Sequence, residues 1–411
     1  MLSSATSEGN LLAAKRSIVA FKKNQQVKKA LLHLYQEGSL TLAKLAELLN
    51  TSIPSATQII DQLTDDGWVN TIGTVSGNNG RRPVLFSLNP SGHYAVILDS
   101  NTHDTTLLLV NPLREIIFQQ RVDMALEDSP RFSEFLVSFV NEAVAESGVD
   151  KSSIVGVGLS LPGLIDSQHG LNLSYTNLAL PDQSLTAWLE QQWNWPVFMI
   201  NDTKATALGE HRFGSSVGKQ HALTINIDWG VGLGIIINGE VFHGASGFAG
   251  ELGHIQVAPQ GELCYCGKIG CLDTLTSASS LVKRVQREVQ AGQVTKLAVF
   301  HDDPGQITIS HVIQAAAQGD TFAIDQLHET GYQLGKGLAI AVTLFNPEII
   351  VIDGVLAEAS LFITNSIKLA INKHCLSGFR NDLLVEVTQL NGAAKWLGTH
   401  AHVLESLFAD T

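Results

Sequence analysis

The chain has 411 residues, of which 45% are hydrophobic and 36 are glycine. This composition is typical of a globular α/β protein with two or three domains, and it excludes a disordered or fibrous chain. The longest apolar runs, such as Leu338–Phe345, are far too short to span a membrane, and the first residues contain no apolar secretory segment. We therefore expect a cytoplasmic protein.

The net charge of −13 argues against a chain that binds nucleic acid along its whole length. The charge is nevertheless unevenly distributed. Residues 1–90 contain nine Lys and Arg against six Asp and Glu, a net charge of +3, and the remainder contains 17 against 33, a net charge of −16. A mildly basic head on an acidic body favours a protein in which only the head contacts phosphates.

The head has the helix order of a helix-turn-helix. Apolar residues at helical spacing predict a first helix over Val27–Leu34, a second over Thr41–Leu49 and a third from about Pro54 to Asp65. Ser39 or Thr41 is expected to cap the second helix. A turn of a few residues between the second and third helices completes the pattern.

The third helix and the hairpin after it supply candidate DNA contacts. Short polar side chains on the helix can reach base edges in a major groove. Strands predicted at Val69–Val75 and Pro83–Leu88 enclose a glycine-rich tip with two arginines, a wing that can contact phosphates or a minor groove. The predicted DNA-binding residues are Ser52, Ser55, Thr57, Gln58, Arg81 and Arg82. The alternative is a three-helix protein-interaction module with solvated arginines.

The body, from residue 90 onward, contains two series in which strands are followed by helices. Each series predicts an α/β unit, so a duplicated α/β domain with a cleft between its halves is expected. The first series has strands at Ala95–Asp99, Thr105–Asn111, Ile116–Val122 and Ile154–Ser160, with a helix near Ser133–Ser147. The second has strands at His221–Asp228, Gly234–Ile237, Val241–Phe242 and Glu348–Ile352, with helices near His311–Gln318 and Asp320–Phe345.

Three of the four cysteines lie within eight residues, close in sequence to a histidine. His254, Cys264, Cys266 and Cys271 offer one imidazole and three thiolates, a common ligand set for tetrahedral zinc. Gly267 and Gly270 permit the tight backbone of such a knuckle. The alternative, three unligated core cysteines, leaves the spacing and the histidine unexplained, whereas the isolated Cys375 is expected to be a core residue.

Carboxylates and amides that could bind sugar hydroxyls occur at two points. Asn201 and Asp202 follow a strand at Val197–Ile200, and the carboxyl ends of strands are where α/β clefts bind ligands. Glu251 and His254 are three residues apart, so they share one face if that segment is helical. Taken alone, Asp202 could also be a simple helix cap.

Four segments, in this order, resemble the signatures of the ROK family (repressors, open reading frames and sugar kinases). They are Leu161–Asp166, Asn201–Asp202, Gly250–His254 and Cys264–Asp273. The resemblance covers residues 15–405, and the head makes the chain similar to the repressor branch, which includes glucose- and N-acetylglucosamine-responsive regulators. It implies an actin-like, RNase H-like sugar-kinase fold behind a winged helix-turn-helix, and a structural zinc ion at the Cys/His cluster.

The resemblance also assigns roles in sugar binding. In the ROK kinases the residue matching Asp202 is the general base, and those matching Glu251 and His254 hold the sugar ring. Asn177 and Asn201 are expected to bind further hydroxyls. Where the family usually has glutamate, this chain has Asp273, which is one methylene shorter. One nitrogen of His254 would then bind zinc and the other a sugar hydroxyl.

The elements that hold ATP in the kinases are altered at three places. Residues 99–104 (DSNTHD) replace an aspartate followed by a Gly-Gly-Thr turn, residues 228–230 (DWG) replace Gly-Thr-Gly, and residues 352–355 (IDGV) replace a glycine run. Side chains and added carboxylates oppose the approach of phosphates to the backbone. We therefore predict a body that binds sugar without phosphorylating it, the alternative being an active hexose kinase.

The predicted domains are a winged helix-turn-helix at 1–89, actin-like subdomains at 90–205 and 206–385, the second with the zinc knuckle and a dimerisation surface, and a C-terminal helix at 386–411. The expected partners are an inverted-repeat operator in double-stranded DNA, a sugar or sugar-phosphate effector, a second copy in a homodimer or homotetramer, and a sugar permease component. A protein effector with a vestigial sugar cleft is a further alternative.

Overall fold

A computed structural model describes residues 25–74, 83–179 and 183–409. The chain divides into two compact units. Unit 1 comprises Met1–Leu159, Asn177–Phe198 and His400–Thr411, and unit 2 comprises Ser160–Thr176 and Met199–Thr399. Among the described residues, no helix combines the length and apolarity that crossing a membrane requires.

The head of unit 1 is a winged helix-turn-helix, as the sequence predicts. Residues 25–37 are helical, and Thr41 caps the second helix by accepting a hydrogen bond from the Lys44 N–H (3.2 Å). The second and third helices contact each other, and each has a buried alanine, Ala46 and Ala56. A three-stranded sheet of order β1-β3-β2 completes it. The elements are β1 (Leu40–Thr41), α2 (Leu42–Leu48), α3 (Ile53–Asp65), β2 (Val69–Thr74) and β3 (Val84–Leu88).

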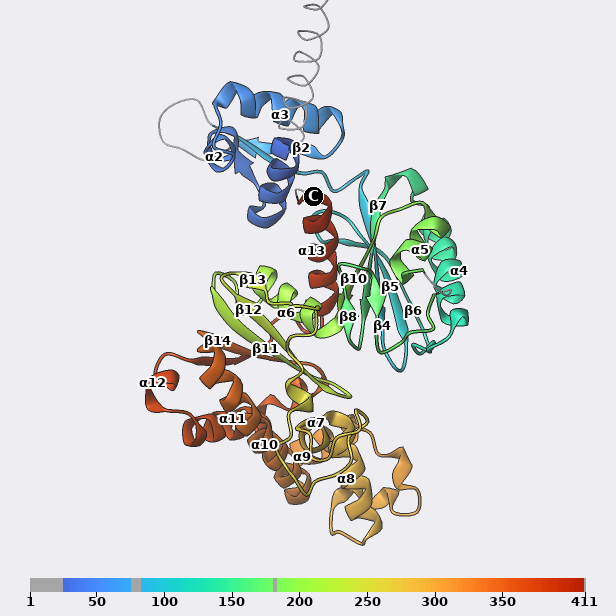
Figure 1. Cartoon of the computed structure of the whole chain (residues 1–411), viewed down its shortest axis with the longest axis vertical. Coiled ribbons are helices and arrows are strands. Elements are labelled where there is room, and N and C mark those ends of the chain that lie inside the picture. Colours follow the sequence, from blue (N-terminus) through green and yellow to red (C-terminus); the bar gives the residue numbers. More distant parts are fainter. Residues whose placement is uncertain (1–24, 75–82, 180–182, 410–411) are drawn as a thin grey trace, which may run out of the picture. The chain divides into compact units, whose positions relative to one another are not determined.

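A five-stranded sheet of order β10-β7-β4-β5-β6 follows in the chain. Strands β4, β5 and β6 form an antiparallel meander within unit 1, and Figure 1 shows α4 and α5 against one face of the sheet. The strands are β4 (Tyr94–Ser100), β5 (Thr105–Val110), β6 (Ile116–Val122), β7 (Ile154–Leu161) and β10 (Val197–Asn201). The helices are α4 (Pro130–Ser147) and α5 (Leu185–Trp193). The predicted strands and the helix before β7 are confirmed to within a few residues.

Unit 2 has a second five-stranded sheet, of order β13-β12-β11-β14-β15, in which β14 pairs in parallel with β11 and β15. The strands are β11 (His221–Ile227), β12 (Val231–Ile237), β13 (Glu240–Val241), β14 (Ile349–Asp353) and β15 (Leu384–Val387). The helices include α6 (Asp202–Phe213), α7 (Asp273–Thr276), α8 (Ala278–Gln290), α9 (Ile309–Ala317), α10 (Thr321–Phe345), α11 (Ser360–His374) and α12 (Ser377–Arg380). The second predicted series is thus confirmed, although α6, α8 and α11 were not foreseen.

Small residues set the helix packing in unit 2. A Cβ on Gly331 of α10 would lie 2.7 Å from the carbonyl oxygen of Ile363 in α11, so the two backbones approach too closely for a side chain. The last helix, α13 (Ala394–Phe408), likewise meets α6 through Gly209 and Gly398. Helix α13 begins in unit 2 and ends in unit 1.

Candidate functional site

The start of α6 brings Asn201 and Asp202 to the carboxyl end of β10, the position predicted from the sequence. The Asn201 side chain is the N-cap: its Oδ1 accepts from the Lys204 N–H (3.1 Å), and its Nδ2 donates to the Gly163 carbonyl (3.0 Å). Asp202 is the first helical residue, and its Oδ1 accepts from the Thr203 N–H (2.7 Å). The cap is therefore Asn201, and capping of α6 does not account for Asp202.

Lys204, which the sequence analysis did not single out, is buried beside these residues. It is only 5% exposed, and its Nζ donates to the Gly247 carbonyl oxygen. Burial lowers the pKa of Lys204, while the negative charges of Glu251 and Asp202 raise it. A lysine in the first turn of a helix is usually exposed and belongs to no recognisable motif, so the burial of Lys204 could not be predicted from the sequence.

Glu251 and His254 lie on a single 3₁₀ turn, Leu252–His254, for which Glu251 is the N-cap. Glu251 Oε2 lies 3.9 Å from His254 Nε2. The turn packs closely on β12, because a Cβ on Gly253 would be 2.3 Å from the Val231 carbonyl oxygen. Partial burial raises the pKa of Glu251, and His254 and Lys204 lower it. The predicted pairing of these two residues on one face is confirmed.

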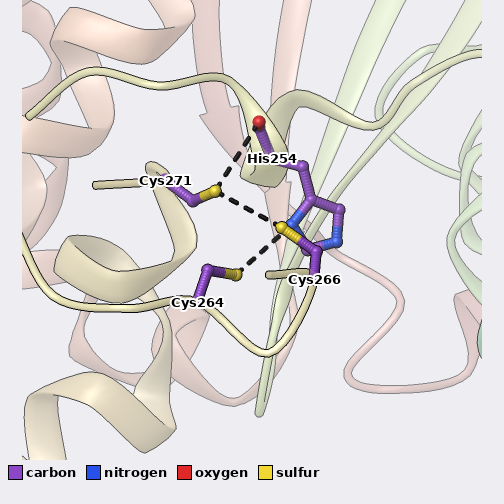
Figure 2. A group of neighbouring side chains, drawn as sticks. All are labelled: His254, Cys264, Cys266 and Cys271. Atoms are coloured by element: carbon purple, nitrogen blue, oxygen red, sulfur yellow. Dashed lines mark hydrogen bonds between the residues drawn. The ribbon is translucent and has the colours of Figure 1, made fainter. Parts of the chain in front are cut away.

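The four predicted metal ligands converge (Figure 2). Their ligand atoms all lie within 4.8 Å of one another; Cys264 Sγ is 3.6 Å from His254 Nδ1, and Cys266 Sγ is 3.6 Å from Cys271 Sγ. With Zn–S of about 2.3 Å and Zn–N of about 2.0 Å, tetrahedral ligands lie about 3.5–3.8 Å apart, so the group fits such an ion. Gly267 and Gly270 adopt positive φ of 85° and 74°, as the knuckle requires.

The hydroxyl of Tyr265 lies 3.0 Å from His254 Nε2, on the opposite side of the imidazole from the thiols. Tyr265 stands between two of the cysteines, and this position between ligands is the one signal that could have drawn attention to it. Although most of the Tyr265 surface is exposed, desolvation around its hydroxyl raises the pKa of the phenol, and the carboxylate of Asp273 and the thiol of Cys264 raise it further. Tyr265 is therefore a neutral hydroxyl among carboxylates.

Asp273 begins α7 and is only 5% exposed. Its Oδ2 accepts from the Val231 N–H at the start of β12 (3.0 Å). Burial raises the pKa of Asp273, whereas the Val231 hydrogen bond and the charge of His254 lower it. One carboxylate oxygen of Asp273 is thus already hydrogen-bonded to the backbone.

The remaining predicted residues lie in unit 1. Asn177 donates through its N–H (2.7 Å) and Nδ2 (2.9 Å) to the carboxylate of Asp128. At the start of α3, Ser52 and Gln58 are exposed, whereas Ser55 and Thr57 are half-buried. Ser52 is the N-cap of α3, and Thr57 Oγ1 donates to the Ile53 carbonyl (2.9 Å). Arg81 and Arg82 lie outside the described residues.

Residues 99–104 form a turn that is closed by one of its own side chains. Asn101 Oδ1 accepts hydrogen bonds from the backbone N–H of His103 (2.8 Å) and Asp104 (3.2 Å). Its Nδ2 donates to Asp104 Oδ1 (3.1 Å), and Asp104 pairs with Arg121. Two amides that could bind an anion are therefore already satisfied.

The other two altered loops, both in unit 2, are joined by a carboxylate. Asp228 Oδ1 accepts from the Val355 N–H (2.8 Å), so the DWG loop caps the turn after β14. Asp353 at the end of β14 is 6% exposed, and its Oδ2 has no hydrogen-bond partner among the described residues. Burial raises the pKa of Asp353, and the charge of Asp228 raises it further. Two carboxylates at one turn oppose a nucleotide phosphate.

Known proteins resemble the chain over nearly its whole length. The family model described as "ROK family" matches residues 96–405, and the "MarR family" model matches residues 25–71. The xylose repressor of Caldicellulosiruptor bescii is 29% identical over 371 residues, covering 90% of this chain and 93% of that protein. The DNA-binding transcriptional dual regulator NagC of Escherichia coli (strain K12) is 29% identical over 356 residues, covering 87% and 86%.

Solved structures give the same grouping. A ROK family transcriptional regulator described as a homolog of the E. coli MLC protein has a TM-score of 0.81 at 28% identity and covers 94% of this chain and 97% of its own. A ROK family glucokinase from Streptomyces griseus, solved with glucose and AMPPNP, has a TM-score of 0.63 at 28% identity and covers 74% and 97%. The resemblance inferred from the motifs is confirmed, and this chain belongs to the ROK family.

Proposed function

We propose that this chain is a DNA-binding transcriptional repressor of sugar uptake or metabolism genes, and that a sugar bound by its kinase-like body controls it. The observation that carries the proposal is a combination: a winged helix-turn-helix precedes a body that keeps Asp202, Glu251 and His254 but satisfies its phosphate loops internally. Relatives named as xylose and N-acetylglucosamine repressors support it.

The proposed DNA-binding surface is α3 with the wing. Ser52 and Gln58 are exposed on α3 and are placed to reach base edges, with Ser55 and Thr57 beside them. Arg81 and Arg82 of the wing would contact phosphates or a minor groove. A homodimer or homotetramer would place two heads on the half-sites of an inverted repeat.

The proposed cofactor is a structural Zn²⁺ ion held by His254, Cys264, Cys266 and Cys271. The spacing of the four ligand atoms and the soft thiolate donors support zinc. The ion would fix the orientation of the His254 ring. With Nδ1 turned toward the thiols, Nε2 would be left for a ligand.

The proposed effector residues are Asn177, Asn201, Asp202, Glu251, His254 and Asp273. Asp202, Glu251 and His254 carry most of the assignment. Asn201, Asp273 and Asn177 are engaged with Gly163, Val231 and Asp128, so each would bind a hydroxyl with its remaining hydrogen-bonding capacity. A free sugar is the first choice, and a sugar phosphate is the alternative that the experiment below separates.

Helix α13 supports coupling between effector and DNA. In unit 2 its first turns contact α6, the helix that begins at Asp202, with no room for a side chain at Gly398. In unit 1 the His400 Nδ1 of α13 lies 2.9 Å from the Tyr35 hydroxyl of the head, and the Phe408 ring lies edge-on to that of Trp68 (5.5 Å). Movement of α6 on sugar binding would therefore reach the head through one helix.

The proposed domain boundaries are 1–89, 90–205, 206–385 and 386–411. The last segment contains α13, and the third contains the zinc knuckle. For the homodimer, Ile340 and Leu344 of α10 offer apolar surface, since the Leu344 side chain is 70% exposed. A sugar permease component is a further proposed partner, which would sequester the repressor from DNA.

The test is fluorescence anisotropy of the zinc-loaded protein on DNA from upstream of its own and neighbouring genes, at two salt concentrations. Each titration is repeated with D-xylose, D-glucose, N-acetyl-D-glucosamine and their phosphates. Sequence-selective binding weakened by one ligand is expected. Failure to bind any fragment with zinc and fold intact contradicts the proposal, as does ADP release at ordinary kinase rates in the presence of ATP and sugar.

Matched variants sharpen the assignment of the DNA surface. Gln58→Ala is expected to weaken operator binding roughly tenfold and to relax specificity at one base pair, because a base-edge hydrogen bond is lost. Gln191→Ala, at an exposed glutamine of α5, serves as the control. The double variant Arg81→Ala/Arg82→Ala should reduce the slope of log affinity against log salt by about 2 if both arginines contact phosphates.

A further inference from the structure

The hydroxyl of Tyr265 occupies the nitrogen of His254 that the proposed function assigns to a sugar hydroxyl. Tyr265 Oη lies 3.0 Å from His254 Nε2, and the two rings meet edge-on, with centroids 5.1 Å apart and planes at 78°. Glu251 Oε2 lies 3.9 Å from the same nitrogen. A phenolic hydroxyl and a sugar hydroxyl offer the same donor and acceptor, so they compete for one position.

The backbone keeps Tyr265 within reach of this position. Its neighbours Cys264 and Cys266 are both in the metal-ligand group, and the turn is closed by hydrogen bonds from Cys264 N to Lys268 O (2.8 Å) and from Gly267 N to Cys264 O (2.9 Å). Residue 265 is therefore anchored on both sides. A side chain on an anchored backbone acts at a high effective concentration.

The ring of Tyr265, by contrast, has little to hold it. The residue is 81% exposed, although His254 is only half-buried beneath it. Moving the side chain away from His254 therefore sacrifices one hydrogen bond and very little apolar burial. A side chain with these properties blocks a binding position weakly and reversibly.

We propose that Tyr265 is a displaceable internal ligand of the effector site: its hydroxyl occupies His254 Nε2 in the sugar-free protein, and an effector binds by displacing it. This inference rests on the proposed function, because it places a sugar at His254. Tyr265 thereby sets the sugar concentration at which the repressor responds. It also disfavours ligands that lack a hydroxyl able to take its place on His254.

The first test is calorimetric titration of the full-length, zinc-loaded protein with D-xylose, D-glucose and N-acetyl-D-glucosamine. Tyr265→Phe removes the competing hydroxyl and is expected to bind the cognate sugar roughly three- to tenfold more tightly, with unchanged zinc content. Tyr332→Phe is the matched control, because the Tyr332 hydroxyl lies 3.3 Å from His374 Nε2 on the helix pair α10 and α11. Equal or weaker sugar binding by Tyr265→Phe overturns the inference.

A second measurement separates this inference from the sugar proposal. In sugar-free, ¹⁵N-histidine-labelled protein, Tyr265→Phe should shift the Nε2 resonance of His254, and Tyr332→Phe should shift that of His374 instead. If none of the three sugars binds any variant, the choice of effector fails while the His254 resonance still decides the role of Tyr265. An unchanged His254 resonance in Tyr265→Phe overturns the inference.

Discussion

The proposed effector residues and the residues of the altered phosphate loops use their polar groups in opposite ways. The first group is Asp202, Glu251 and His254, and the second is Asn101, Asp228 and Asp353. The Glu251 side chain is 45% exposed, and His254 Nε2 lies 3.0 Å from the exposed Tyr265 hydroxyl. Asn101, in contrast, accepts a hydrogen bond from a backbone amide of its own loop, and Asp228 accepts one from the Val355 amide of the neighbouring loop. The altered loops thus satisfy backbone amides with side chains, whereas the proposed effector residues keep polar groups exposed.

The largest expected effect comes from removing the proposed zinc ion beside the proposed effector residues. Cys264→Ser should abolish stoichiometric zinc and lower the free energy of unfolding by about 3–5 kcal/mol, because loss of a structural metal is among the most destabilising single changes. Zinc analysis by mass spectrometry and urea unfolding measure both quantities. Cys375→Ser is the control, since Cys375 lies in the hydrophobic core of unit 2 and outside the metal-ligand group, and its thiol donates to the Ala339 carbonyl (3.5 Å). Full zinc content in Cys264→Ser would refute the ligand set.

The next effect tests whether the effector residues still bind sugar. Asp202→Asn should weaken binding of the cognate sugar roughly ten- to hundredfold, because hydrogen bonds to a charged group are worth about 1.5–3 kcal/mol. Titration calorimetry measures the change. Asp325→Asn, at an exposed aspartate of α10, should leave the affinity unaltered. Equal affinities in all three proteins would mean that Asp202 is vestigial and that the contrast drawn above does not hold.

A smaller effect is expected on the pH dependence of stability, through the buried carboxyl of Asp353. The pKa of Asp353 is raised in the folded protein, so ionisation opposes folding, and the wild type should lose stability as the pH rises through that raised pKa. Asp353→Asn cannot ionise and should be about 1 kcal/mol more stable at pH 8, with the difference vanishing as the pH falls toward the ordinary value of 3.8. Urea unfolding at several pH values measures this difference, and a pH-independent difference would contradict the assignment.

The smallest effect on function is expected at Asn101. Asn101→Ala loses the side-chain hydrogen bonds of its turn and should cost about 1 kcal/mol of stability. Sugar and operator affinities should stay within about twofold of the wild type, since no phosphate is handled there. Operator binding and ADP release are measured together. If Asn101→Ala gained ADP release, the loop could still bind phosphate once the Asn101 side chain is removed, and the predicted absence of phosphorylation would be wrong.

The sequence by itself determined the features that depend on neighbouring residues. Helical periodicity located α3, the strand at Ile116–Val122 was predicted with its observed bounds, and the spacing of three cysteines around two glycines identified a metal-ligand group. The resemblance to the ROK family, which rests on short motifs, implied that the phosphate loops are altered. These features follow from hydrogen bonds and backbone angles set within a few residues, so a single stretch of sequence is enough to reveal them.

Only the tertiary structure decided how distant residues are used. It buried Lys204 beside Asp202, joined Asp228 to Val355, and paired Tyr35 with His400 at 2.9 Å across 365 positions of the chain. It also placed the Tyr265 hydroxyl on the nitrogen of His254 that faces away from the thiols. Burial and pairing of this kind depend on the path of the whole chain. They arise from packing between distant elements, and the local sequence of one element does not indicate which other element it contacts.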